Sequence, residues 1–149
     1  MLREKAVKYF EDHYEDFLEE LKSLVRVPSI SAGGFDRQNV ADSAEATAHL
    51  MRKSGLENVE ILEVNGSHPY VYGEWVKKKI APTVLLYAHH DVQPTGDISR
   101  WKTAPFEPKI IGDRLFGRGA ADDKAGVVSS IAAVASYLKS VNEIPLNVK

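Results

Sequence analysis

A short, uninterrupted apolar run near the middle of the chain constrains the fold most. Residues 84–88, with the sequence VLLYA, contain no polar side chain apart from the tyrosine hydroxyl, and His89, His90 and Asp91 follow directly. Strands covered on both faces of a parallel sheet have continuous apolar runs of this kind. Pro94 prevents the strand from extending further. The pattern predicts a buried parallel strand whose carboxyl end, where open α/β sheets assemble their sites, presents metal-binding and acid-base side chains.

The composition is that of a globular domain and narrows the possible functions. The chain has 149 residues, 44% of them hydrophobic and 27% charged, enough for one domain with a core. A net charge of −2 argues against a basic surface for nucleic acid or an anionic membrane. The lack of cysteine leaves His, Asp and Glu as the metal ligands. No apolar segment suits a secretory signal or a membrane span, so we expect a cytoplasmic protein.

Helical and strand patterns surround the central run. Apolar residues recur at steps of three or four through residues 2–25, which predicts one long helix ending before Pro28. The same periodicity predicts a helix over residues 36–54. Five further elements are predicted: strands at 58–64 and 70–76, a hairpin around Gly112, a helix entered through 117–126 and running to 140, and a final strand from 144. This order predicts a layered α/β domain.

His89 and Asp91 form the first candidate site. They are two residues apart, so on an extended backbone both side chains point to the same side. Imidazole and carboxylate together suit zinc, cobalt or manganese. Asp91 could bind such an ion directly, or it could accept the second N–H of the imidazole and orient it.

Asp122 and Asp123 form the second candidate site. They lie at the predicted start of a helix, where the backbone N–H groups and the helix dipole stabilise carboxylates. Two solvated aspartates beside a helix N-cap are the alternative interpretation. A phosphate-binding loop is excluded because the glycine pattern is incomplete and two aspartates would repel a phosphate.

Three segments taken together resemble a known family. They are HHDVQP at residues 89–94, Trp101 with Pro105-Phe106, and GRGAADDK at residues 117–124. They resemble the amino-terminal part of the dinuclear-zinc exopeptidases and deacylases. That family includes carnosinase-like dipeptidases, acetylornithine deacetylase, succinyl-diaminopimelate desuccinylase, aminoacylase and glutamate carboxypeptidase. The resemblance covers nearly the whole chain and is greatest to the dipeptidase and carnosinase branch.

The resemblance implies a role for each residue of the two motifs. His89 would be a ligand of one metal ion, and Asp122 would bridge two divalent ions, zinc or else cobalt or manganese. Asp91 would belong to the catalytic machinery by orienting His89. A cis peptide bond is expected at Asp122–Asp123, and His90 is expected to face away from the metal ions. The implied reaction is hydrolysis of a peptide or amide bond in dipeptides or N-acyl amino acids by a metal-activated water.

The resemblance also implies that residues 1–149 are the N-terminal portion of an α/β/α catalytic domain. The general base, the remaining ligands and a lid domain that mediates homodimerisation would lie beyond residue 149. We therefore expect the 149-residue chain to be inactive by itself.

Two other classes of function fit parts of the sequence. His90-Asp91 resembles the HD pair of metal-dependent phosphohydrolases, but that fold is helical and this pair ends a predicted strand. A non-catalytic α/β binding module with a remnant metal site is the second alternative. The presence of His89, Asp91 and Asp122 together favours the enzyme.

Overall fold

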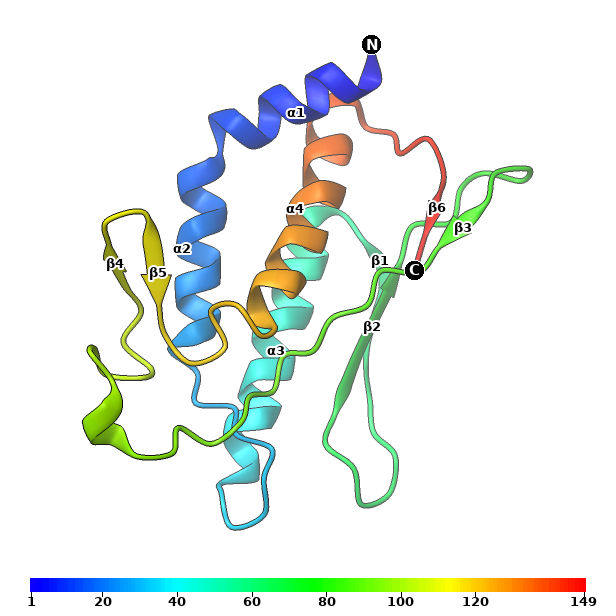
Figure 1. The fold of residues 1–149 in the computed structure, drawn as a ribbon. Helices are drawn as coiled ribbons and strands as arrows, with labels where there is room; N and C mark the ends of the chain where they lie inside the picture. The colour runs from blue at the N-terminus through cyan, green and yellow to red at the C-terminus, as the bar shows by residue number, and fades with distance from the viewer.

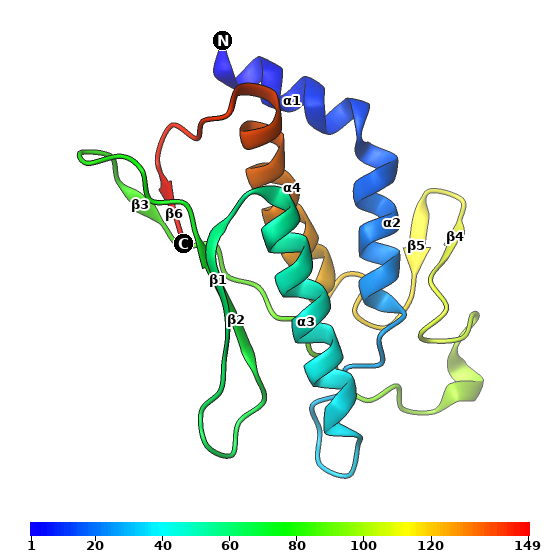
Figure 2. The ribbon, with the colours of Figure 1, turned by 180° about the vertical axis from the view of Figure 1, so that it is seen from behind.

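Four α-helices lie beside three pairs of short strands in the computed structural model, which describes residues 1–149 (Figures 1 and 2). The helices are α1 (Leu2–Asp12), α2 (Tyr14–Val25), α3 (Arg37–Ser54) and α4 (Lys124–Val141), with a 3-10 turn at Ile98–Arg100. The strands are β1 (Glu57–Leu62), β2 (Tyr70–Glu74), β3 (Thr83–Val84), β4 (Lys109–Ile111), β5 (Arg114–Phe116) and β6 (Asn147–Val148). The mixed α/β class predicted from the sequence is confirmed. No helix is long and apolar enough to cross a membrane.

The predicted N-terminal helix is divided in two, so the prediction of one continuous helix was wrong. The break lies at His13, whose backbone leaves the helical region at φ −119° and ψ 17°. Its ring stacks on Tyr9, and its Nδ1 lies 2.8 Å from the Tyr9 carbonyl oxygen. The chain turns there, and α1 crosses the end of α4 while α2 runs beside it (Figure 1). Apolar periodicity continues through the break because both helices face α4.

Helix α3 begins and ends where the sequence predicted. The side chain of Asp36 accepts a hydrogen bond from the Gln38 backbone N–H at 2.9 Å, which caps the helix start. Gly55 adopts a left-handed φ of 101° and ends the helix. The buried face includes Val40 and Ala44, both with no exposed surface.

Four strands form a nearly continuous mixed arrangement. β1 and β2 pair antiparallel, and β3 pairs parallel with β6. An antiparallel bridge between Trp75 and Val148 joins the end of β2 to β6. The spatial order is therefore β1, β2, β6, β3, with the β4–β5 hairpin apart from it, beside α2 (Figure 1).

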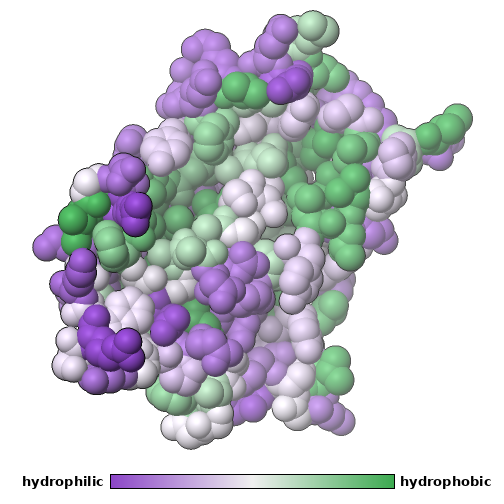
Figure 3. All heavy atoms as spheres, viewed as in Figure 1, coloured by the Kyte–Doolittle hydropathy of each residue, from purple (hydrophilic) through white to green (hydrophobic).

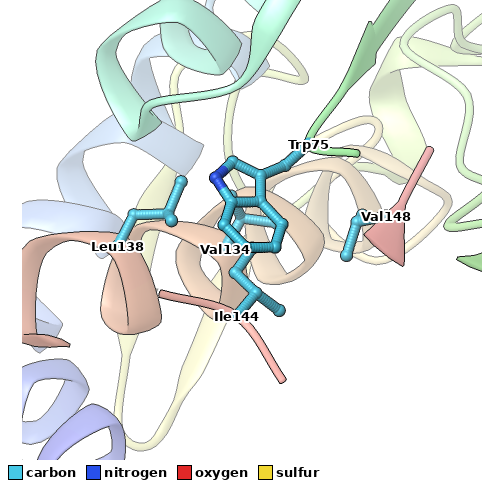
Figure 4. Close-up of a cluster of buried hydrophobic side chains, with 5 residues drawn as sticks. All are labelled: Trp75, Val134, Leu138, Ile144 and Val148. Atoms are coloured by element: carbon cyan, nitrogen blue, oxygen red, sulfur yellow. The ribbon is translucent and has the colours of Figure 1, made fainter. Parts of the chain in front are cut away.

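Helix α4 packs into both buried apolar clusters. In the first, Trp75 contacts Val134 and Leu138 of α4 together with Ile144 and Val148 (Figure 4). In the second, Leu24 of α2 packs against three further α4 residues, Val127, Val128 and Ile131. The predicted helix that runs to residue 140 is thus present, and it buries a wide apolar face.

The central apolar run is exposed, so the prediction that both faces of this strand are covered was wrong for this chain. Only Thr83–Val84 form a strand, and the side chains of Leu85 and Tyr87 are 75% and 80% exposed. Backbone pairing continues on one side as far as Leu86, whose N–H donates to the Lys149 carbonyl at 2.8 Å. A strand is covered only if neighbours flank it, and β6 contributes no more than two residues here.

A cavity of about 500 Å³ lies beside the exposed run. It separates β2 from residues 85–91, with Val40, Met51 and Val127 of α3 and α4 among its lining side chains. Apolar side chains gather on the side of the molecule where these strands lie (Figure 3). An open, apolar strand edge of this kind favours pairing with another chain.

We therefore expect the 149-residue chain to self-associate through residues 84–88. Replacing Tyr87 by aspartate should weaken association about tenfold, since burying one large side chain is worth about 1.5 kcal/mol. Ile80 is fully exposed outside this segment, and Ile80→Asp is the matched control. Sedimentation velocity over a range of concentrations measures the effect. A monomer at all concentrations, or equal weakening by both variants, contradicts it.

Candidate metal centre

Three segments that are distant in the sequence meet at the end of the central run. Ile30 and Val92 form a parallel bridge, in which the Val92 N–H donates to the Ser29 carbonyl at 2.9 Å. The turn that enters α4, residues 117–124, lies against the same place, where the His89 backbone N–H donates to a carboxylate oxygen of Asp123. The site thus lies at the carboxyl end of the central run, as predicted from the sequence.

The structure brings His89 and Asp122 together. The imidazole Nε2 lies 3.0 Å from the Asp122 Oδ1, although 33 positions separate the two residues. On the other side of the ring, Nδ1 lies 3.1 Å from the Asp91 carbonyl oxygen and 3.3 Å from the Asp91 Oδ1. Each ring nitrogen therefore faces an acidic residue, one from each sequence motif.

The site is open on the Asp122 side. The side chain of Asp122 is 84% exposed, compared with 39% for His89 and 37% for Asp91. No group of three or more His, Asp or Glu side chains is arranged to hold a metal ion in this chain. The chain thus supplies a pair of candidate ligand atoms with one face uncovered.

The turn before α4 has the backbone that the family resemblance implied. The Asp122–Asp123 peptide bond is cis. Asp123 then points back toward the central run, and its Oδ2 accepts the His89 N–H at 3.2 Å. Sequence reasoning singled out the doubled aspartate but missed this contact, because the pattern does not reveal which backbone group a carboxylate meets.

Neighbouring acidic residues raise the pKa of His89. Partial burial favours the neutral ring, but the Asp91 carbonyl and the carboxylates of Asp91, Asp123 and Asp122 outweigh it, and the pKa of His89 is raised. Burial lowers the pKa of His90, whose Nε2 lies 3.2 Å from the Pro69 carbonyl oxygen. His90 therefore contacts the β1–β2 connection and not Asp122. Metal-dependent phosphohydrolases with an HD pair have a helical fold. The mixed α/β fold of this chain therefore excludes that interpretation of His90-Asp91.

Lys124, the last residue of the GRGAADDK segment, lies beneath the site, and the sequence assigned no role to it. Its side chain has no exposed surface, and its Nζ donates to the carbonyl oxygens of Leu24 at 2.7 Å and Val27 at 2.8 Å. Burial lowers its pKa to about 8, against the opposing effect of the Asp91 carboxylate. Lys124 ties the turn that carries Asp122 to the end of α2.

Gly119 allows this turn to approach the central run. Its φ is +84°, and a Cβ there would lie 2.6 Å from the Val92 Cγ1. We expect Gly119→Ala to lower the free energy of unfolding by about 2–4 kcal/mol, through the left-handed backbone and the overlap together. Gly66→Ala is the control, since Gly66 has a similar φ of +81° with open space around it. Urea unfolding measures both, and equal losses would show that the contact with Val92 contributes nothing.

The chain is similar in sequence and in fold to known proteins. Residues 85–149 match the sequence model of Peptidase family M20/M25/M40. The succinyl-diaminopimelate desuccinylase of Rhodospirillum centenum is 38% identical over 124 residues, which are 79% of this chain and 29% of that protein. Human carnosine dipeptidase 1 superposes with a TM-score of 0.90 and 27% identity, over 99% of this chain and 33% of that one. An M20 family metallo-carboxypeptidase from Sulfolobus solfataricus has a TM-score of 0.77 and 33% identity, over 89% of this chain and 29% of its own.

These relatives are much longer than the present sequence. The chain spans about a third of the length of each of them. Their names are those of hydrolases: a desuccinylase, a dipeptidase and a carboxypeptidase. The chain is therefore a homologue of the M20/M25/M40 peptidases, and its mixed α/β fold matches part of the catalytic domain of that family.

Proposed function

We propose that this chain provides the first half of the active site of a metal-dependent hydrolase that cleaves peptide or amide bonds. The observation that carries the proposal is the pairing of the His89 Nε2 with the Asp122 Oδ1 at 3.0 Å. The names of a dipeptidase and a desuccinylase among the relatives indicate dipeptides and N-acyl amino acids as the substrate classes.

The paired atoms fit a divalent metal ion such as zinc. Imidazole nitrogen and carboxylate oxygen are zinc ligands, and two atoms that each lie 2.0–2.2 Å from one zinc ion are roughly 3–3.5 Å apart. The 3.0 Å between His89 and Asp122 meets this condition. The exposed face of Asp122 leaves its carboxylate free to bridge to a second ion. Divalent ions bound there would polarise the substrate carbonyl and lower the pKa of a bound water.

The other residues of the site would hold the ligands in place. Asp91 faces the His89 Nδ1, so it would keep the proton on that nitrogen and leave Nε2 free to bind metal. Asp123 fixes the His89 backbone. Lys124 anchors the turn that carries both aspartates.

Residues 1–149 would form the N-terminal portion of a catalytic domain. No third ligand or general base is gathered at the site, and the cavity beside residues 85–91 is open. The missing groups would come from the extended protein, which is a polypeptide that continues past Lys149 to the full length of the relatives. A lid domain in that continuation would make the homodimer contacts. Residues 1–149 by themselves would be inactive.

Hydrolysis by the extended protein tests this function. Dipeptides and N-acyl amino acids are offered with zinc, cobalt or manganese, and free amino acid is measured. We expect turnover that a chelator abolishes and added metal restores, and no turnover by residues 1–149. Turnover that survives chelation contradicts the proposed mechanism. No turnover of any substrate by the extended protein favours the non-catalytic binding module.

A further inference from the structure

We propose that Ser31 is a positioning residue for the metal site, which holds the Asp91 carboxylate against His89. This inference rests on the proposed function and adds a residue from the loop between α2 and α3. The Ser31 hydroxyl donates to the Asp91 Oδ2 at 2.5 Å, although the two residues are 60 positions apart.

The contact completes a chain of four side chains. Ser31 binds one oxygen of Asp91, and the other oxygen lies 3.3 Å from the His89 Nδ1. The opposite nitrogen of the same ring, Nε2, faces Asp122 at 3.0 Å. One carboxylate oxygen of Asp91 thus faces the hydroxyl and the other faces the imidazole, whose Nδ1 also lies 3.1 Å from the Asp91 carbonyl oxygen. Ser31 is therefore connected to the imidazole that carries the proposed ligand atom, Nε2, by two contacts: Ser31 to Asp91 and Asp91 to His89.

The backbone places Ser31 opposite Asp91. The Val92 N–H donates to the Ser29 carbonyl at 2.9 Å, and the Ser31 N–H donates to the Val92 carbonyl at 3.4 Å. Ile30 and Val92 are only 6% and 2% exposed, so the bridge between them is held in the core. Ser31 is therefore carried on a short parallel segment and not on a free loop.

The contact between Ser31 and Asp91 is a hydrogen bond from a neutral hydroxyl to a charged carboxylate. A hydroxyl that donates to a carboxylate makes a short bond of 2.5–2.7 Å, stronger than a bond between neutral groups. Such a bond restricts rotation of the carboxylate, because its second oxygen is no longer free to turn away. Asp91 is 37% exposed, so water competes with the imidazole for its oxygens when the hydroxyl is removed.

Ser29 is the matched control in the same loop. It lies two positions before Ser31, and its hydroxyl donates to the His90 backbone carbonyl at 2.8 Å. Ser43 donates to the same carbonyl at 3.0 Å, so that oxygen retains a donor when Ser29 is changed. Ser29 therefore supports the backbone and does not contact a carboxylate of the site.

Two measurements on Ser31→Ala, Ser31→Thr and Ser29→Ala test the inference. The first is the tautomer of neutral His89 in residues 1–149, from long-range proton–nitrogen correlation at alkaline pH. We expect Ser31→Ala to raise the fraction of rings with the proton on Nε2 about threefold or more. Ser31→Thr, which keeps the hydroxyl, and Ser29→Ala should resemble the original chain. The free energy of unfolding of each variant is measured alongside.

The second measurement is zinc affinity in the extended protein. Loss of a group that orients a ligand costs about 10–100-fold in metal affinity, which is our expectation for Ser31→Ala. Equal tautomer fractions in the original chain and Ser31→Ala overturn the inference, as does an equal effect of Ser29→Ala in both measurements. If the extended protein binds no zinc, the proposed function fails, and the tautomer measurement still decides the role of Ser31.

Discussion

Replacing Asp122 by alanine in the extended protein should lower kcat/KM by ~10³-fold or more. The proposed bridging carboxylate would hold both metal ions, which stabilise transition-state charge by several kcal/mol. A loss of about 4 kcal/mol in transition-state stabilisation corresponds to a 10³-fold lower rate. Folding should be little affected, because the side chain is 84% exposed and makes its polar contact with His89 alone. Activity and the free energy of unfolding are therefore measured on the same preparation.

Asp113→Ala is the control for this substitution. Asp113 is 96% exposed in the turn between β4 and β5, and it lies outside the site. It should keep full activity. Asp122→Asn retains the shape of the side chain without its charge and should lose nearly as much activity as the alanine variant. Full activity of Asp122→Ala would exclude Asp122 as a ligand of the catalytic metal ions.

Replacing Lys124 by methionine should lower the free energy of unfolding of residues 1–149 by roughly 2–4 kcal/mol. The substitution keeps most of the volume but removes two hydrogen bonds from the ammonium group to the Leu24 and Val27 carbonyls, and a hydrogen bond that involves a charged group contributes about 1.5–3 kcal/mol. Each carbonyl keeps a backbone N–H donor, from Val27 at 3.1 Å and from Ser29 at 2.8 Å. The cost of burying an ammonium, seen in its lowered pKa, offsets part of this loss. Urea unfolding gives the value.

Lys139→Met is the control, since Lys139 is an exposed lysine of the same helix. It should change stability by less than about 0.5 kcal/mol. Equal stability of the Lys124 and Lys139 variants would show that the buried contacts of Lys124 contribute nothing net. In the extended protein, Lys124→Met should also weaken zinc binding, because the turn that carries Asp122 loses its anchor on α2.

Structural features that depend on residues close together in the sequence could be predicted. Asp36 and Gly55 bound α3 as expected, since a capping carboxylate and a left-handed glycine act within a few residues of the helix end. The cis peptide at Asp122–Asp123 was expected from family resemblance, not from the chemistry of the residues. The pairing of His89 with Asp122 was also implied by the resemblance, whereas the rule that sites form at the carboxyl ends of strands indicated only the position of His89 and Asp91.

Features that depend on distant partners could not be predicted. The break at His13 leaves the apolar periodicity intact, so periodicity did not reveal it. The apolar run at 84–88 indicates burial, but which segments flank it is decided elsewhere, and in this chain it is exposed. Neither Lys124, which ends the GRGAADDK segment, nor Ser31 received a role from the sequence, because only the fold shows the carbonyl or carboxylate that each one contacts.

Zinc binding by the extended protein, measured by calorimetry, tests the central claim most directly. We predict two zinc ions per chain in the original sequence, with binding lost or much weakened in His89→Ala and in Asp122→Ala. Residues 1–149 by themselves should bind zinc weakly or not at all, because they gather only two candidate ligand atoms. No zinc binding by the extended protein, or binding unchanged in both variants, would contradict a metal site built on His89 and Asp122.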